Sequence, residues 1–145
     1  LRFMNIYGPR ITKVYRRVCS KFAEATIRNE PLVIVGDGKQ TRDFTYITDA
    51  INTVLLTLNH NNIKGETFNI GTGKPTTINQ LANLYKKIYG NSKQEIKHIS
   101  AKKGDLRYSY ADIAKAKKTL GYKPKINLET GIAKYLEWYK KYSKN

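Results

Sequence analysis

The sequence predicts a single α/β domain. Short segments rich in β-branched and aromatic residues alternate along the chain with longer segments whose apolar residues recur at helical spacing. Glycine, proline and asparagine separate the two kinds of segment. The chain has 145 residues, of which 40% are hydrophobic and 26% are charged, a composition typical of one globular domain with its own core.

Several short segments are expected to form strands. The clearest is a run of Leu, Val, Ile and Val at 32–35, which Gly36-Asp37-Gly38 closes with a tight turn. The first expected strand ends at Gly8-Pro9, and its sequence reads as if the chain opened within a strand. The expected strands are residues 1–7, 32–35, 43–47, 67–70 and 96–100.

Helical spacing of apolar residues predicts a helix after most of these strands. The third of these helices has the strongest start signal, because Thr77 and Gln80 form a capping-box pattern, and it is expected to stop at Gly90. Asp112 is expected to cap the fourth helix. The expected helices are residues 13–29, 49–58, 78–89, 113–120 and 128–142.

The second expected helix carries the most apolar stripe. Thr48 or Asp49 is expected to cap its first turn. Four apolar residues then follow at helical spacing and are expected to face the core. They are Ile51, Val54, Leu55 and Leu58.

The chain is strongly basic. Its 27 basic and 11 acidic residues give a net charge of +16, and most of the excess lies after Tyr85. Such a charge predicts affinity for polyanions or phosphorylated ligands, although scattered lysine pairs are also typical of an ordinary solvated surface.

Several classes are excluded or disfavoured by composition. No apolar run approaches the ~20 residues that cross a bilayer, and the first residues lack the apolar region of a signal peptide. A single cysteine, Cys19, excludes a disulfide framework and a cysteine-based zinc site, and it suits the reducing cytoplasm. We therefore expect a cytoplasmic protein that does not contact a membrane.

Common catalytic patterns are also missing from the sequence. His60 and His98 stand far apart with no ligand spacing around them, and there is no Gly-x-Ser-x-Gly elbow. Gly71-Thr72-Gly73 has only part of a dinucleotide-binding pattern and is interpreted as a structural turn. Tyr89 and Lys93 have Tyr-x-x-x-Lys spacing, but the glycine between them interrupts the helix that would align them.

What remains is a set of residues suited to a phosphorylated sugar ligand. Arg42 follows the 36–38 glycine turn, and a guanidinium matches phosphate oxygens in a bidentate geometry. Lys102 and Asp105 flank a second turn, with an ammonium for phosphate and a carboxylate for ribose hydroxyls. The amide of Asn5 can bind either a hydroxyl or a phosphate. Together they predict a sugar-nucleotide pocket, not a groove for duplex DNA.

Ordered motifs along the whole chain resemble one family. Residues 1–10 and 36–49 are similar to the L-R-x-x-N-x-Y-G-P-R and G-D-G-x-Q-x-R-D-F-x-Y-V-x-D segments of extended short-chain dehydrogenase/reductases, the NAD-dependent epimerase/dehydratase family. Asn69-Ile70-Gly71-Thr72-Gly73 resembles their N-I/V-G-T-G. Further similar segments follow in the family's order at residues 103–107, 111–116 and 120–124.

The resemblance covers only the C-terminal half of that family. It implies that residues 1–7 are a late strand of a Rossmann NAD-binding domain whose remainder is absent, and that residues 8–145 are a small mixed α/β substrate-binding domain. The absent half would hold NAD and the catalytic Ser/Thr and Tyr-x-x-x-Lys, so we expect no catalytic residue in this chain and no activity from it alone.

The resemblance also implies contacts for single residues. Asn5 would touch the substrate sugar or phosphate, Arg42 and Lys102 would hold the diphosphate, and Asp105 would hold the ribose. The family usually has Arg-Pro where Lys102-Lys103 stands, so this chain lacks the bidentate geometry there.

Two further contacts concern the base and the cofactor. The segment from Val33 to Val35 would line the nucleotide base, and Val35 replaces a common aromatic residue. Met4 falls where the family backbone approaches the nicotinamide of NAD.

Within the family, the motifs look most like UDP-hexose or UDP-N-acetylhexosamine 4-epimerases, which act through a transient 4-keto sugar and are typically homodimers. Nucleotide-sugar dehydratases and decarboxylases remain alternatives. A basic, non-catalytic nucleic-acid-binding domain is the alternative from another class, and a free-standing nucleotide-sugar-binding domain is a third. Nucleic acid is the less expected partner, because several tyrosines lie on helix stripes and are assigned to the core.

Overall fold

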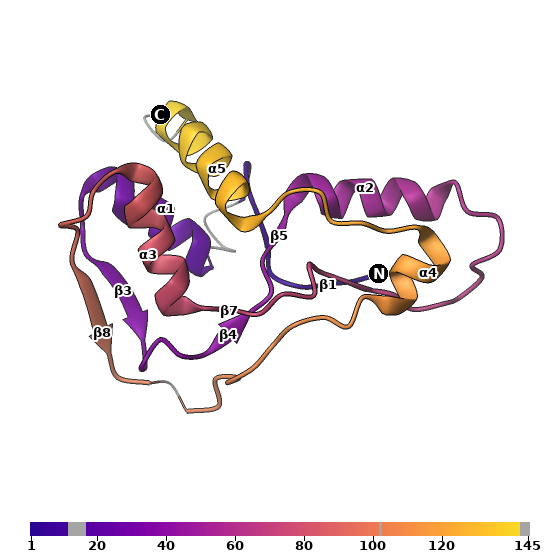
Figure 1. Cartoon of the computed structure of the whole chain (residues 1–145), viewed down its shortest axis with the longest axis horizontal. Helices are drawn as coiled ribbons and strands as arrows, with labels where there is room; N and C mark the ends of the chain where they lie inside the picture. Colours follow the sequence, from indigo (N-terminus) through magenta and orange to yellow (C-terminus); the bar gives the residue numbers. More distant parts are fainter. Residues whose placement is uncertain (12–16, 102, 143–145) are drawn as a thin grey trace.

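The computed structural model describes residues 1–11, 17–101 and 103–142. These residues form five helices and several short strands, a mixed α/β fold that confirms the predicted class. None of the helices in the described ranges has both the length and the apolar character needed to cross a bilayer. In chain order the elements are β1 (Arg2–Phe3), β2 (Ile6–Tyr7), α1 (Val18–Arg28), β3 (Leu32–Val35), β4 (Thr41–Arg42), β5 (Thr45–Tyr46), α2 (Ile47–Leu58), β6 (Asn69–Ile70), β7 (Thr76–Thr77), α3 (Ile78–Tyr89), β8 (Ile96–Ile99), α4 (Ala114–Leu120) and α5 (Leu128–Tyr142) (Figure 1).

The strands pair two by two and do not form one continuous sheet. β1 pairs with β6, β2 with β5 and β3 with β8, all in parallel, while β4 and β7 pair antiparallel. The β3–β8 pair is the longest, with Leu32 opposite Ile96 and Val35 opposite Ile99. Because parallel neighbours need long crossovers, each of the three parallel pairs joins segments that are far apart in the chain.

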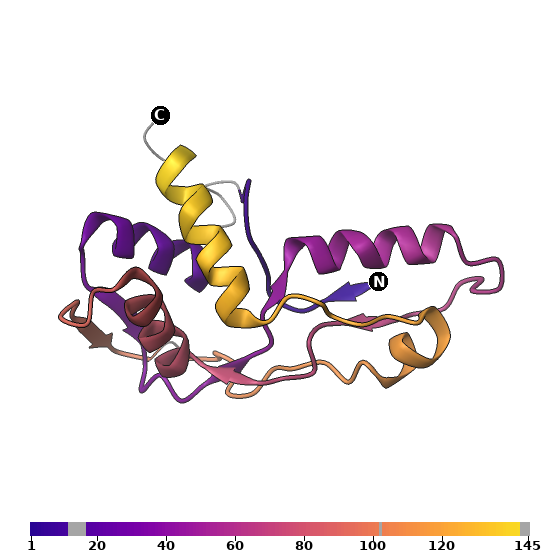
Figure 2. The same cartoon turned by 45° about the horizontal axis from the view of Figure 1, so that its top comes forward.

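The core has two parts at opposite ends of the molecule. In the first, helices α1, α3 and α5 pack on one another and on β3, around buried residues such as Phe22, Leu81 and Tyr135. In the second, β6 and α4 enclose Phe68 and Tyr122. Both views show α1, α3, β3 and β8 gathered at one end and β1, α2 and α4 at the other (Figure 1, Figure 2).

Local signals predicted α3 well. The Thr77 side chain accepts a hydrogen bond from the Gln80 N–H, the Gln80 side chain accepts from the Thr77 N–H, and Gly90 ends the helix with a φ of 76°. These contacts confirm the predicted capping box, which depends on residues within one helical turn. The predicted cap of α4 is wrong, because Ile113 occupies its N-cap without a side-chain cap bond, and the Asp112 side chain, one position earlier, accepts from the Ala114 N–H.

Other boundaries were predicted less accurately. The expected strand at 1–7 is two short strands, and the expected strand at 43–47 shortens to β5 because α2 already begins at Ile47. The pair β4 and β7 was not predicted. Residues 12–16, where the first helix was expected to begin, lie outside the described residues.

The prediction for the inward face of α2 is wrong. Ile51, Val54, Leu55 and Leu58 are exposed, with Leu58 at 75%, while Asp49, Ala50 and Thr53 are buried. The expected cap is wrong as well, since Tyr46 occupies the N-cap without a side-chain cap bond. The Asp49 carboxylate instead accepts hydrogen bonds from the backbone N–H groups of Lys125 and Ile126, which draws that face of α2 against the chain leading to α5.

Candidate functional site

A cleft of about 500 Å³ lies between α1, β3, β4 and the segment that follows β8. Its walls include five residues that the sequence selected as ligand contacts: Asn5, Val33, Val35, Arg42 and Asp105. The fold therefore brings together side chains from segments as far apart in the chain as Asn5 and Asp105. A second hollow of about 310 Å³ adjoins it, and Val35, Gln40 and Asp105 line both.

Arg42 is the most firmly held charge in the cleft. Its Nη1 donates to the carbonyls of Leu106 at 2.7 Å and Thr41 at 2.8 Å, and its Nη2 donates to Asp105 Oδ1 at 2.8 Å. The Arg42 side chain is only 16% exposed, whereas that of Asp105 is 47% exposed. Two backbone carbonyls thus set the direction of the guanidinium, and its charge is balanced by one carboxylate at the cleft edge.

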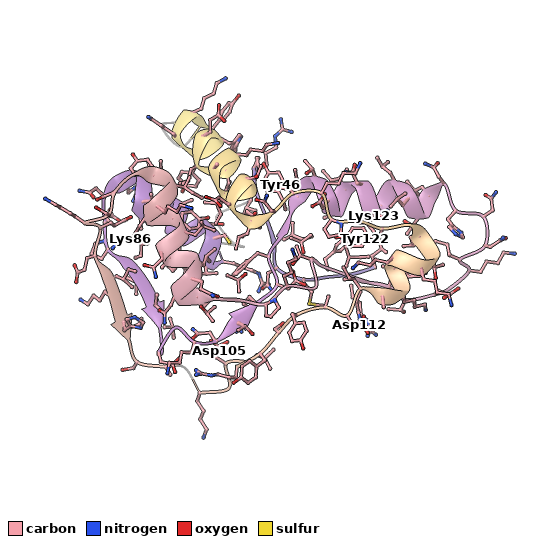
Figure 3. The ribbon with its side chains drawn as sticks, viewed as in Figure 1. Tyr46, Lys86, Asp105, Asp112, Tyr122 and Lys123 are labelled. Carbon is pink, nitrogen blue, oxygen red and sulfur yellow. The ribbon has the colours of Figure 1, made fainter. Side chains whose placement is uncertain are left out.

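Asp105 lies on the irregular segment that links β8 to α4, beside β4 (Figure 3). Asp105 is 63 positions away from Arg42 in the chain. A carboxylate that is half exposed and already accepts one arginine bond keeps acceptor capacity for hydroxyl groups of a ligand.

The opposite wall of the cleft is apolar. Val33 is 45% exposed and Ile99 is 44% exposed, on the neighbouring strands β3 and β8. The Val35 carbonyl accepts from Gln40 Nε2 at 2.7 Å, so it is already engaged by the protein. This surface suits a flat, partly apolar group that contacts side chains.

Asn5 lies at the far side of the cleft, between β1 and β2. Its Nδ2 donates to the Asp43 carbonyl at 3.2 Å, and its own carbonyl accepts from the Thr45 N–H. These bonds fix the amide between the start of the chain and β5.

Helix α1 supplies cleft residues that the sequence did not reveal. Arg17, the N-cap of α1, and Lys21 within the helix line the cleft together with Phe22. Their spacing of one helical turn places both cations on the same face of the helix, which is the only signal of this role in the sequence. Helical periodicity alone could not say that this face borders a cleft.

The Gly71-Thr72-Gly73 turn is structural, as interpreted from the sequence. The buried Asp43 carboxylate accepts from the N–H groups of Thr72, Gly73 and Ala111 and from the Thr72 hydroxyl. A Cβ on Gly71 would lie 2.4 Å from Asp43 Oδ2, which explains the glycine. The turn is therefore occupied by a carboxylate of the protein and has no room for a phosphate.

Tyr122 closes the same turn from the other side. Its hydroxyl donates to the Gly71 carbonyl at 2.8 Å, and burial raises the pKa of this phenol. The phenol is therefore a neutral structural donor at ordinary pH.

The remaining selected residues lie elsewhere. Met4 donates its N–H to the Ile70 carbonyl and packs its side chain on the second core cluster, outside the cleft. Lys102 lies outside the described residues. His60 and His98 contact separate backbone carbonyls, and the described part of the chain contains no group of side chains that could hold a metal ion.

Comparisons with known proteins show the family to which the chain belongs. The family model described as GDP-mannose 4,6 dehydratase matches residues 1–135. The chain belongs to the NAD-dependent epimerase/dehydratase family. The resemblance inferred from the motifs is thereby confirmed.

Solved structures of family members share the fold. The UDP-glucose 4-epimerase of Thermotoga maritima, solved with UDP-glucose, is 40% identical, with a TM-score of 0.88 over 97% of this chain and 45% of that chain. The UDP-glucuronic acid 4-epimerase of Bacillus cereus, solved with UDP-glucuronic acid and NAD, is 33% identical, with a TM-score of 0.89 over 97% of this chain and 44% of that one.

The family also includes decarboxylases. UDP-glucuronic acid decarboxylase 1 of Xenopus tropicalis is 34% identical over 97% of this chain and 32% of its own length. The chain spans less than half of each of these three relatives and corresponds to their C-terminal part.

Proposed function

We propose that this chain is the substrate-binding portion of an NAD-dependent UDP-sugar 4-epimerase, which acts on a UDP-hexose or UDP-N-acetylhexosamine through a transient 4-keto sugar. The observation that carries the proposal is the cleft in which Asn5, Val33, Val35, Arg42 and Asp105 meet. Its cationic, carboxylate, amide and apolar parts match the chemically distinct parts of a nucleotide sugar.

Each residue has a role in this proposal. Arg42 holds the diphosphate, because a guanidinium binds phosphate oxygens through charge-assisted hydrogen bonds. Asp105 accepts from the ribose hydroxyls, and Asn5 binds the sugar or a phosphate. Val33 and Val35 contact the base. Lys102 supplies a further cation for the diphosphate.

The described residues alone do not fit NAD. The one glycine turn with part of a dinucleotide pattern is filled by the Asp43 carboxylate. We therefore assign NAD, which accepts and returns the hydride of the sugar, mainly to a domain of which residues 1–7 form the end. The Met4 backbone is the proposed contact from this chain, and residues 8–145 form the substrate-binding domain.

Two observations support this division. β1 pairs with β6 alone among the described strands, so its other edge is open to a further parallel strand. The apolar stripe of α2 is exposed next to this pair, which suits cover by another domain. The catalytic groups are likewise assigned to the part of the relatives that this chain does not span, so the chain by itself is expected to be inactive.

A decarboxylase acting on a UDP-sugar acid is the second candidate, because a decarboxylase matches almost the whole chain. The same cleft would bind the nucleotide of a decarboxylase substrate. The reaction product therefore distinguishes an epimerase from a decarboxylase. An epimerase yields an isomer of unchanged mass, whereas a decarboxylase releases carbon dioxide.

The proposal includes a cytoplasmic homodimer. The free thiol of Cys19 is buried, which is compatible with a reducing compartment. Light scattering of the longer protein measures its oligomeric state.

We do not propose nucleic acid as a partner. Binding of duplex DNA that weakens steeply with salt would contradict this.

The Arg42→Ala substitution tests the proposed function in the longer protein that contains this chain. Losing a charge-assisted bond to phosphate costs about 1.5–3 kcal/mol, so UDP affinity is expected to fall roughly 10- to 100-fold by calorimetry. Arg28→Ala is the matched control, because Arg28 is 61% exposed and pairs with Glu24 within α1. Equal UDP affinity in wild type and Arg42→Ala would contradict the assignment.

A further inference from the structure

Few apolar side chains of the segment that carries Asp105 are buried. After β8 it leaves the sheet, and it returns to the core only at Ala111. Between these points Leu106 is 66% exposed, Tyr108 is 70% exposed and Tyr110 is 58% exposed. Apolar burial therefore does not hold this loop, which we define as residues 103–110, against the rest of the molecule.

An arginine–aspartate pair fastens the middle of the loop. Arg107 Nη1 donates to Asp37 Oδ1 at 2.7 Å and Nη2 donates to Asp37 Oδ2 at 2.8 Å, so both ends of the guanidinium fork are used. The two side chains are 47% and 48% exposed. They line the smaller hollow and not the main cleft. The pair thus stands beside the proposed ligand without touching its cleft.

Asp37 stands on a well-defined turn. Its Oδ1 also accepts from the Lys39 N–H at 2.9 Å, and its carbonyl accepts from Asn79 Nδ2 at the start of α3. The next residue, Gly38, has a φ of +71°, and a Cβ there would overlap Asn79. The carboxylate that receives Arg107 is therefore fixed to the helical part of the fold.

The loop and the turn are also joined nearer to the cleft. Arg42 bonds both Asp105 and the Leu106 carbonyl, and the Thr41 N–H donates to the Arg107 carbonyl at 2.9 Å. In the proposed function, the phosphate groups of the ligand bind the same Arg42 guanidinium that contacts Asp105 and Leu106. When the guanidinium binds the ligand, the Thr41–Arg107 backbone bond and the Asp37–Arg107 pair continue to hold the loop beside the cleft.

We propose that Asp37 and Arg107 are positioning residues of the substrate cleft, which keep Asp105 at its edge while Arg42 turns to the diphosphate. The inference rests on the proposed function of the cleft. It predicts that the pair contributes to nucleotide affinity and not to the chemical step, because neither residue lines the main cleft.

The test uses Asp37→Asn and Arg107→Gln in the longer protein with NAD. Asp37→Asn keeps an oxygen for the Lys39 N–H, so the turn is preserved while the charge pair is lost. Since exposed ion pairs contribute little, KM for the UDP-sugar and Kd for UDP are expected to rise about fivefold, with kcat within about twofold of wild type. Amide hydrogen exchange at Thr41 and in residues 104–110 is expected to accelerate.

Two further variants separate positioning from a general loss of stability. Arg107→Lys keeps the charge without the fork and is expected to give an intermediate KM. The double variant Asp37→Asn/Arg107→Gln is expected to be no worse than either single variant, because both remove one interaction. Glu66→Gln is the control, since it breaks a pair of 2.8 Å with similar exposure on the far end of the molecule and is expected to leave KM unchanged.

The outcomes distinguish this inference from the proposed function. A wild-type protein that binds neither UDP nor a UDP-sugar overturns both. Normal wild-type binding with an unchanged KM in both single variants overturns only the positioning role. A fall in kcat at constant KM, or additive effects in the double variant, also overturns it.

Discussion

Arg42 and Asp43 are neighbours in the chain, yet they differ completely in environment. The Arg42 guanidinium lines the cleft, where its partners belong to a loop about sixty positions away. Asp43 is fully buried and accepts hydrogen bonds from Thr72, Gly73 and Ala111. Arg42 is the last residue of β4 and Asp43 directly follows that strand, so one residue is available for a ligand and the next ties two core segments together.

Replacing Asp43 with alanine is expected to destabilise the fold strongly. The change leaves several buried N–H groups without an acceptor, and one such group costs about 1–3 kcal/mol, so we expect a loss of roughly 3 kcal/mol or more in urea unfolding. Asp112→Ala removes one exposed hydrogen bond, from the Ala114 N–H, and is expected to cost only about 1 kcal/mol. Similar losses for the two variants would contradict the structural role of Asp43.

The Asp37 carboxyl is expected to titrate at unusually low pH. Hydrogen bonds from the Arg107 guanidinium and then from the Lys39 N–H lower the pKa of Asp37 from 3.8 to about 2. Because the pKa is lowered in the folded state, this group stabilises the fold above about pH 3.8, and the contribution is lost as the pH falls through about 2. Carbon-13 NMR of the carboxyl group measures the inflection, which Arg107→Gln is expected to move up towards 3.8. The same inflection in both proteins would contradict the ion pair.

At the scale of elements, α3 and α2 differ in where their start is specified. α3 carries its capping box within Thr77–Gln80, so the sequence predicted its beginning and its end at Gly90. α2 begins at Ile47 without a side-chain cap, directly after β5. Its start is set by the pairing of β5 with β2 and by the contacts of Asp49, which join distant segments.

Removal of the α3 cap is expected to weaken the helix measurably. Thr77→Ala removes the acceptor for the Gln80 N–H and should cost about 1 kcal/mol in thermal or urea unfolding. Thr77→Ser keeps a hydroxyl and is expected to retain most of the stability. Equal stability of the alanine variant and wild type would show that the cap does not contribute.

At the scale of the whole molecule, the exposed apolar face of α2 is the feature on which our domain proposal bears most directly. Ile51 and Leu55 are each 51% exposed, and Leu58 is 75% exposed, on one face of one helix. A contiguous apolar stripe of this kind is typical of a protein interface. The chain also spans less than half the length of its relatives, which agrees with our proposal that another domain covers this face.

Leu55→Ser is expected to have different effects in the two contexts. In the longer protein it should cost about 2 kcal/mol of unfolding free energy, because the side chain would be buried there. In the isolated chain a substitution at this exposed position should change stability by less than about 0.5 kcal/mol. Ile132→Ala is the control, since Ile132 is buried within the chain and should destabilise both. Equal effects of Leu55→Ser in both contexts would contradict the proposed cover of α2.

Much of the candidate site could be predicted because its signals are local. Glycine turns next to Arg42 and Asp105, and an amide after the first strand at Asn5, were recognisable from neighbouring residues alone. Arg17 and Lys21 were missed because only the packing of α1 beside β3 shows which helix face borders the cleft. The Asp37–Arg107 pair was missed because its partners are 70 positions apart.

Local patterns in the sequence were enough to predict the α/β class, the capping box at Thr77 and Gln80, and candidate residues for binding a phosphorylated sugar. These follow from interactions between residues within a few positions of one another. Long-range packing sets which face of α2 is covered, brings Asp49 to a distant backbone and not to its own helix cap, and brings Asp105 to Arg42. Helical spacing identifies the apolar side chains of a helix but not the elements that pack on them. Ion pairs between residues far apart in the chain depend on the tertiary fold, which brings their segments together.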